Sequence, residues 1–247
     1  MRVVVNLVIM VLELAAIAGV AWLGLHHPYL LAVLAAVLAF VLGLSLERAR
    51  LKIELGFYLG RPPGSLTMLA SLVAFAEAFV KALLAGVVTL ITFSGTDQQR
   101  LVVVAVVFGC CLFAGTSLLR RLSISFGVVP SRWGYFRLAA PLGLLFSAAI
   151  YLATVLKLLP KATLTEVAGK LVLDTPSVLS LERASELLFI LKQKFDDIIV
   201  TVLQQILSPE LAQIAGILVS VNMLTGFAIG VFAVAIADVV QRLETTE

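Results

Sequence analysis

The chain has little charge and very few of the residue types that build catalytic and metal sites. Of its 247 residues, only 13% are Asp, Glu, Lys or Arg, while 61% are hydrophobic. So few polar side chains cannot cover a water-soluble fold, and the mean hydropathy of +1.11 is typical of a membrane protein. The only cysteines are Cys110 and Cys111, and the only histidines are His26 and His27. These four residues can supply neither a metal tetrad nor a disulfide framework.

The signatures of common enzyme classes are also missing. The sequence has no Gly-rich phosphate loop, no nucleophile elbow and no paired-aspartate protease motif. Its two histidines are adjacent, so they cannot ligate a haem from two facing helices. We therefore expect no enzyme activity, no catalytic residue, no cofactor and no metal. The excess of three positive charges fits loops that meet anionic lipid headgroups, so no nucleic-acid partner is expected.

Six long apolar stretches make up most of the chain. Each is long enough to cross the hydrocarbon core of a bilayer, where only helices and closed barrels satisfy the backbone, and no alternating strand pattern is present. The first stretch resembles a signal peptide, but its apolar run continues to Leu25, so we expect it to remain as a span. The predicted fold class is therefore all-α: a polytopic helical membrane protein with one domain, residues 1–247. The predicted spans are about 3–25, 29–46, 66–93, 101–119, 136–156 and 211–240.

The positive charges of the loops predict the orientation. Residues 47–65 and residues 120–137 carry four Lys or Arg each, whereas the first and third loops together carry only Arg100. Loops enriched in Lys and Arg are cytoplasmic. We therefore expect a multi-pass protein of the cell membrane with both termini in the cytoplasm.

An amphipathic outer helix is predicted at about 177–207, between the last two spans. It follows a helix-start sequence, Asp174-Thr175-Pro176, and apolar residues recur every three or four positions from Ala184 to Val202. Such a helix lies at the membrane surface or packs against its own copy. Its more apolar end, residues 198–207, is too short to span the bilayer, so it is either interfacial or a re-entrant half-helix.

Three stretches of the C-terminal half carry a resemblance: Lys194-Phe195-Asp196-Asp197-Ile198, Met223-Leu224-Thr225-Gly226-Phe227, and residues 132–151. They resemble, in that order, the pore-helix entry, part of the inner helix, and the linker with the outer helix of six-helix tetrameric cation channels. The resemblance implies an oligomer whose last helix lines an axis. The selectivity filter of that family is absent, because only Ile206-Leu207 separate Gln205 from Ser208-Pro209, and the fourth span lacks regularly spaced arginines. Potassium selectivity and voltage sensing are therefore not expected.

Polar residues inside the spans are the candidate pathway residues. Glu13, Glu77 and Lys81 place charge at membrane depth, which is costly unless the charge faces protein or water. Glu77 and Lys81 are four residues apart, so they either neutralise each other or take part in ion or proton passage. Glu13 has no partner on its own helix, so it is protonated, paired with another span or hydrated. Asn222 and Thr225 of the last span either hold helices together or line a polar route.

Gly226 and Gly230 form a Gly-x-x-x-Gly pair, which predicts close helix packing. Two functions follow from these features. The first is a channel-like oligomer for passive ion passage without a potassium-type filter, and the resemblance favours it. The alternative is a non-catalytic structural or accessory subunit of a larger membrane protein complex. In both cases the expected partners are the lipid bilayer and either further copies of the chain or other membrane subunits.

Overall fold

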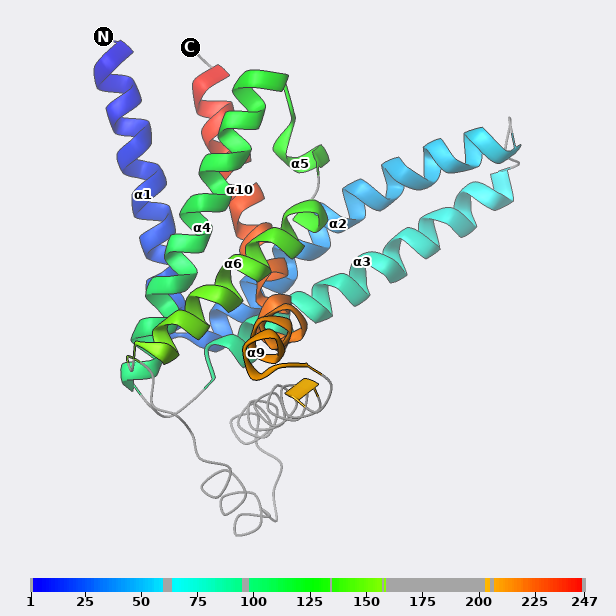
Figure 1. Ribbon diagram of the computed structural model, residues 1–247. Helices are drawn as coiled ribbons and strands as arrows, with labels where there is room; N and C mark the ends of the chain where they lie inside the picture. Colours follow the sequence, from blue (N-terminus) through cyan, green and yellow to red (C-terminus); the bar gives the residue numbers. More distant parts are fainter. Residues whose placement is uncertain are drawn as a thin grey trace.

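The computed structural model describes residues 2–59, 64–94, 98–133, 135–156, 158, 203–204 and 207–245. All regular elements in these residues are helical, and six stretches are long and apolar enough to cross a membrane (Figure 1). The predicted class of helical membrane protein is therefore confirmed. The elements are α1 (Arg2–His26), α2 (Pro28–Leu59), α3 (Gly64–Thr92), α4 (Gln98–Phe126), α5 (Pro130–Trp133), α6 (Tyr135–Val155), α9 (Pro209–Val219), the 3₁₀ turn η1 (Val221–Leu224) and α10 (Thr225–Thr245).

The predicted outer helix at 177–207 lies outside this description, apart from residues 203, 204 and 207. The stretch Lys194-Phe195-Asp196-Asp197-Ile198, which resembles a pore-helix entry, lies outside it as well. The choice between an interfacial and a re-entrant helix therefore remains a prediction.

Helix α10 is the centre of the fold. Its residues 227–234 are all buried, and α1, α2, α3, α4 and α6 contact it. A helix that is apolar on every side is expected to be enclosed in this way. Phe108 of α4 packs edge-on against Phe93, Phe146 and Phe232, with ring centroids 5.2, 6.5 and 6.5 Å away. These aromatic contacts fix α4 and α6 around α10.

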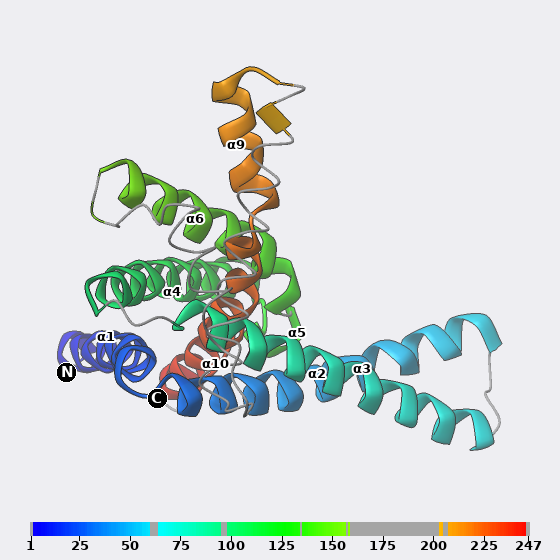
Figure 2. The ribbon, with the colours of Figure 1, turned by 90° about the horizontal axis from the view of Figure 1, so that it is seen from below.

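The last apolar stretch, predicted as a span at about 211–240, is one of the six candidate spans, but two helices and a 3₁₀ turn form it. Helix α9 ends at Val219, η1 follows, and α10 begins at Thr225. The Ser220 side chain accepts a hydrogen bond from the backbone N–H of Asn222 over 3.1 Å, which offers the chain a local alternative to the helical bond. Figures 1 and 2 show α9 turned away from the line of α10. The 21 residues of α10 are about 30 Å long, which is enough to cross the bilayer alone.

Helices α2 and α3 form an antiparallel hairpin that projects from the rest of the bundle, and we call residues 28–59 and 64–92 the arm (Figures 1 and 2). The two helices pack mainly on each other. Small buried residues recur every four positions on both helices, so the backbones approach closely. These residues are Ala35, Ala39 and Gly43 on α2, and Ala74, Ala78 and Ala82 on α3.

The ends of the helices sort into two groups. The N-terminus of α1, the C-terminal end of α4 and the C-terminus of α10 lie at one end of the molecule, and the turn between α1 and α2 lies at the other (Figure 1). Both chain termini are therefore on the same side of the fold.

Helix α2 continues beyond the predicted end of the second span at Leu46 and ends at Leu59. Its charged residues after Leu46 consequently lie on a continuous helix.

Candidate functional site

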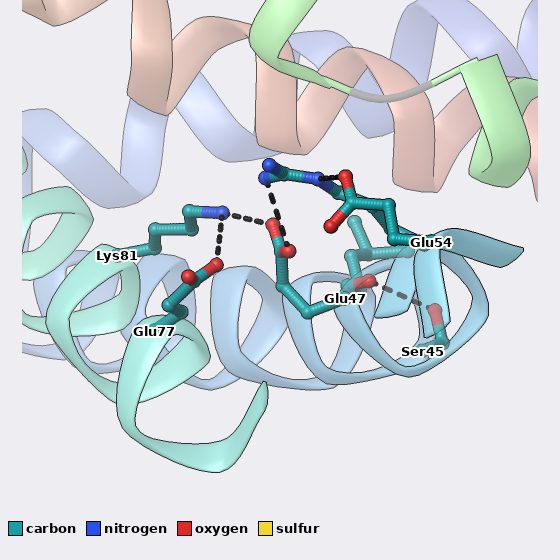
Figure 3. Close-up of polar contacts among 7 residues, drawn as sticks. Ser45, Glu47, Glu54, Glu77 and Lys81 are labelled. Carbon is teal, nitrogen blue, oxygen red and sulfur yellow. Dashed lines mark hydrogen bonds and ion pairs between the residues drawn. The ribbon is translucent and has the colours of Figure 1, made fainter. Parts of the chain in front are cut away.

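The arm carries a cluster of charged side chains drawn from both of its helices. Glu47 lies one helical turn after Gly43, on the buried stripe of α2, so its carboxylate is held against α3. Lys81 Nζ of α3 donates to Glu47 Oε1 and lies 3.8 Å from Glu77 Oε2 (Figure 3). Arg50 lies 3.6 Å from Glu47 Oε2 and bonds Glu54 over 2.6 Å. We refer to Glu47, Arg50, Glu54, Glu77 and Lys81 as the arm cluster.

The members of the arm cluster differ in burial and in how fully they are paired. The side chains of Glu47 and Lys81 are 8% and 19% exposed, whereas that of Glu77 is 41% exposed. Within the described part of the chain, Glu47 Oε2 is buried and accepts no hydrogen bond. The cluster has three carboxylates and two cations, so one negative charge is incompletely compensated. Glu77 is the carboxylate with the longest contact to a cation, and its side chain is as exposed as that of Glu54.

Sequence reasoning identified Glu77 and Lys81 and missed Glu47. The structure brings the two predicted residues within ion-pair distance, but Glu47 is the closer partner of Lys81. Glu47 was missed because the apolar run of the second span ends at Leu46. The spacing of four from Ala39 through Gly43 to Glu47 was the available signal, because it puts the carboxylate on the packing face of the helix.

A second ionic cluster joins α1, α4 and α10. Glu13 belongs to the buried stripe of α1 that includes Ile9 and Ile17. Arg120 of α4 donates from Nη1 to Glu13 Oε2 over 3.1 Å and from Nε to Glu244 Oε1 of α10 over 3.0 Å. Of the three states considered for Glu13, the structure shows pairing with a charge on another helix. Sequence reasoning did not identify Arg120 as the partner of Glu13, or Glu244 as the second partner of Arg120, because these contacts join helices that are distant in sequence.

The polar residues at the start of α10 are engaged inside a single chain. Thr225 is buried, and its hydroxyl forms a 2.9 Å hydrogen bond with that of Thr92 at the end of α3. Asn222 is half-buried in η1, and its backbone N–H donates to Ser220 Oγ. These contacts fasten η1 and α10 to the protomer. The structure does not place Thr225 on an open axis between copies.

Glycines permit a close contact between α6 and the last helix. A Cβ atom on Gly226 would overlap the carbonyl oxygen of Ala139 and the backbone of Gly143. A Cβ atom on Gly143 would overlap the carbonyl oxygen of Met223 in η1. Gly230 is buried one turn further along α10. Gly143, which sequence reasoning did not single out, is thus the α6 residue at this contact.

No metal centre is present in the described ranges, because they hold no group of three or more His, Cys, Asp or Glu arranged to bind an ion.

In comparisons with known proteins, no family model, curated protein or solved structure matches this chain. The resemblance to cation channels therefore remains a prediction from the residues. Function has to be argued from the geometry of the arm and the bundle.

Proposed function

We propose that the protein is a non-catalytic subunit of a larger membrane protein complex and that the arm is its docking element. The observation that carries this proposal is the Glu77 carboxylate, 41% exposed near the middle of α3, a helix of the projecting arm whose only other charged residue is Lys81. An ionisable group that faces lipid at this depth is costly, whereas one that faces protein can be paired. A partner that covers this side of the arm therefore lowers the free energy of the inserted protein.

The proposal is tested by the size and composition of the native assembly. Affinity-tagged full-length protein, extracted from its native membrane in mild detergent, should run as a discrete species that contains a foreign subunit in fixed stoichiometry. Val80→Trp places a bulky side chain on the exposed arm surface, so it should reduce the fraction in that species. The matched control is Val8→Trp on the exposed face of α1. Migration of the wild type as a monomer or homo-oligomer without a foreign subunit contradicts the proposal.

A second candidate function is passive passage of cations or protons through an oligomer, and the arm cluster is the observation that favours it. Ionisable residues within membrane spans commonly mark ion pathways and proton relays. Because α10 is enclosed by its own chain, this candidate rests on Glu47 and Glu77 rather than on a last helix that lines an axis. The pathway in this version runs along the arms of neighbouring copies.

Flux into proteoliposomes tests this second candidate. A pH-sensitive dye and a membrane-potential dye, each trapped in vesicles, should report flux with little discrimination among monovalent cations. Glu47→Gln and Glu77→Gln should lower the flux, whereas Glu54→Gln, an exposed carboxylate already bonded to Arg50, serves as the matched control. A route past η1 would respond instead to Asn222→Leu. Flux no greater than in protein-free vesicles eliminates ion passage.

A further inference from the structure

The charge imbalance of the arm cluster indicates what kind of partner the arm accepts. We propose that the partner contributes a transmembrane helix carrying one Lys or Arg, and that this side chain pairs with Glu77. This inference rests on the proposed function as a complex subunit and specifies the chemistry of the docking surface.

Both cations of the cluster have closer acidic partners than Glu77. Lys81 is hydrogen-bonded to Glu47 in the least exposed part of the arm cluster, and its distance to Glu77 is 3.8 Å. Arg50 bonds Glu54 over 2.6 Å and contacts Glu47 at 3.6 Å. Three carboxylates therefore share two cations. Glu77 has the longest contact with a cation, whereas the equally exposed Glu54 is bonded to Arg50 (Figure 3).

The surface around Glu77 suits an apolar helix. Val73, Val80 and Leu84 are exposed and share the helix face of Glu77, because they lie four residues before it, three after it and seven after it. A partner helix of lipid-compatible residues can lie along this face and bring a single cation to the carboxylate. Charge complementarity at a desolvated contact fixes register and partner choice.

A second copy of the same chain is a poorer match for this surface. On the face of Glu77, a second copy would present its own Lys81, which is already bonded to its own Glu47. Pairing Lys81 with Glu77 of the neighbour would leave the buried Glu47 without its hydrogen-bonded cation. A helix from another protein introduces a new cation and leaves the internal pair intact.

The test measures the binding of designed helices to the full-length protein in lipid nanodiscs. The probes are Leu/Ala helices of about 25 residues with a central Lys, a central Leu or a central Glu, and each carries a fluorescence acceptor. The donor is attached at Tyr58→Cys, on the exposed end of α2, after Cys110 and Cys111 are replaced by Ala. Energy transfer is recorded against the ratio of probe to lipid for wild type, Glu77→Gln, Glu77→Lys and the control Asp238→Asn, which removes a carboxylate of α10 that lies outside the arm and pairs with Arg242.

The central-Lys helix should bind wild type and Asp238→Asn about tenfold more tightly than the central-Leu helix, as one good polar contact between membrane helices would give. Glu77→Gln should abolish this preference, and Glu77→Lys should transfer it to the central-Glu helix. Equal binding of the central-Lys and central-Leu helices to wild type overturns the inference. A Glu77 side chain that carries a proton would give this result. Glu77-dependent association of two labelled copies of the chain also overturns it.

The two proposals fail in different ways. A native assembly with a foreign subunit but no preference for the Lys helix leaves the subunit function standing and removes the basic partner. A clear preference for the Lys helix without any native assembly keeps the basic-helix surface and contradicts the subunit function.

Discussion

Glu13 and Glu47 are carboxylates on largely apolar helices, and each meets a cation from another helix. Arg120 of α4 forms an ion pair with Glu13, and Lys81 of α3 forms one with Glu47. Burial of a charge is tolerated when such a partner is present, whereas removal of one partner leaves the other uncompensated. Replacement of both partners by neutral residues should therefore be less harmful than replacement of one.

The Glu13–Arg120 contact gives the first prediction. Arg120→Gln should destabilise the protein by about 3 kcal/mol, at the low end for a buried pair because the Arg120 side chain is 27% exposed. Thermal unfolding in detergent should show a lower melting temperature, and Glu13→Gln added to Arg120→Gln should restore part of the loss. Arg121→Gln, at the neighbouring exposed residue, is the control. Additive losses in the double variant would show that the two residues do not interact.

The arm cluster gives a second prediction, which ranks its two buried or half-buried acids. Glu47→Gln should lower thermal stability more than Glu77→Gln, because Glu47 is nearly buried and is hydrogen-bonded to Lys81. Lys81→Met should recover stability in the Glu47→Gln background, since the unpaired ammonium is then removed as well. The measurement is again the melting temperature in detergent. A larger loss for Glu77→Gln would mean that Lys81 pairs mainly within its own helix.

At the scale of elements, the sequence predicts the positions of the helices well and their ends and contacts poorly. Long apolar runs identify the spans because hydrocarbon admits only helices of that length. The continuation of α2 to Leu59 is not visible in hydropathy, because charges follow Leu46 on the same helix. At the break after Val219, η1 packs closely on α6, and a linear pattern does not reveal such a contact. Ser220 followed by Asn222 was the only local sign.

The contact between α6 and η1 gives the third prediction. Gly143→Ala would force a Cβ atom into the Met223 carbonyl oxygen, so the broken helix must shift or the two helices must separate. Overpacking of this kind typically costs about 1–3 kcal/mol, and backbone is the obstacle here, so the upper end is expected. The control is Gly19→Ala on α1, where a Cβ atom meets nothing within 4 Å. Equal melting temperatures for the two variants would contradict the close approach of α6 and η1.

The whole molecule consists of a bundle around α10 and an arm that leaves it (Figure 1). The bundle pairs its buried carboxylate Glu13 with Arg120 and packs Phe108 against Phe232, while α1, α4 and α6 also expose apolar side chains. The arm likewise exposes apolar side chains, and it differs in carrying the 41% exposed carboxylate of Glu77 among them. In the proposed function, the bundle stabilises the fold and the arm binds the partner. The side of the membrane that each end of the molecule faces then determines which partner residues can reach it.

The last prediction concerns that sidedness. The loop charges predict that both termini are cytoplasmic, and the fold puts the turn between α1 and α2 at the opposite end. In a background with Cys110 and Cys111 replaced by Ala, Ser131→Cys should be protected from an impermeant thiol reagent in intact cells. His27→Cys, at an exposed residue of the turn, should be labelled, and so should Ser180→Cys.

The pattern of labelling separates the orientation from the fold. If Ser131→Cys is labelled and the other two are protected, the protein is inverted and the fold stands, because the two ends still face opposite sides. If Ser131→Cys and His27→Cys react alike in intact cells, while both react after the membrane is permeabilised, they lie on the same side. That result would contradict the arrangement of α1 and α4, because residue 27 follows the end of α1 and residue 131 follows the end of α4, and these two helix ends lie at opposite ends of the bundle.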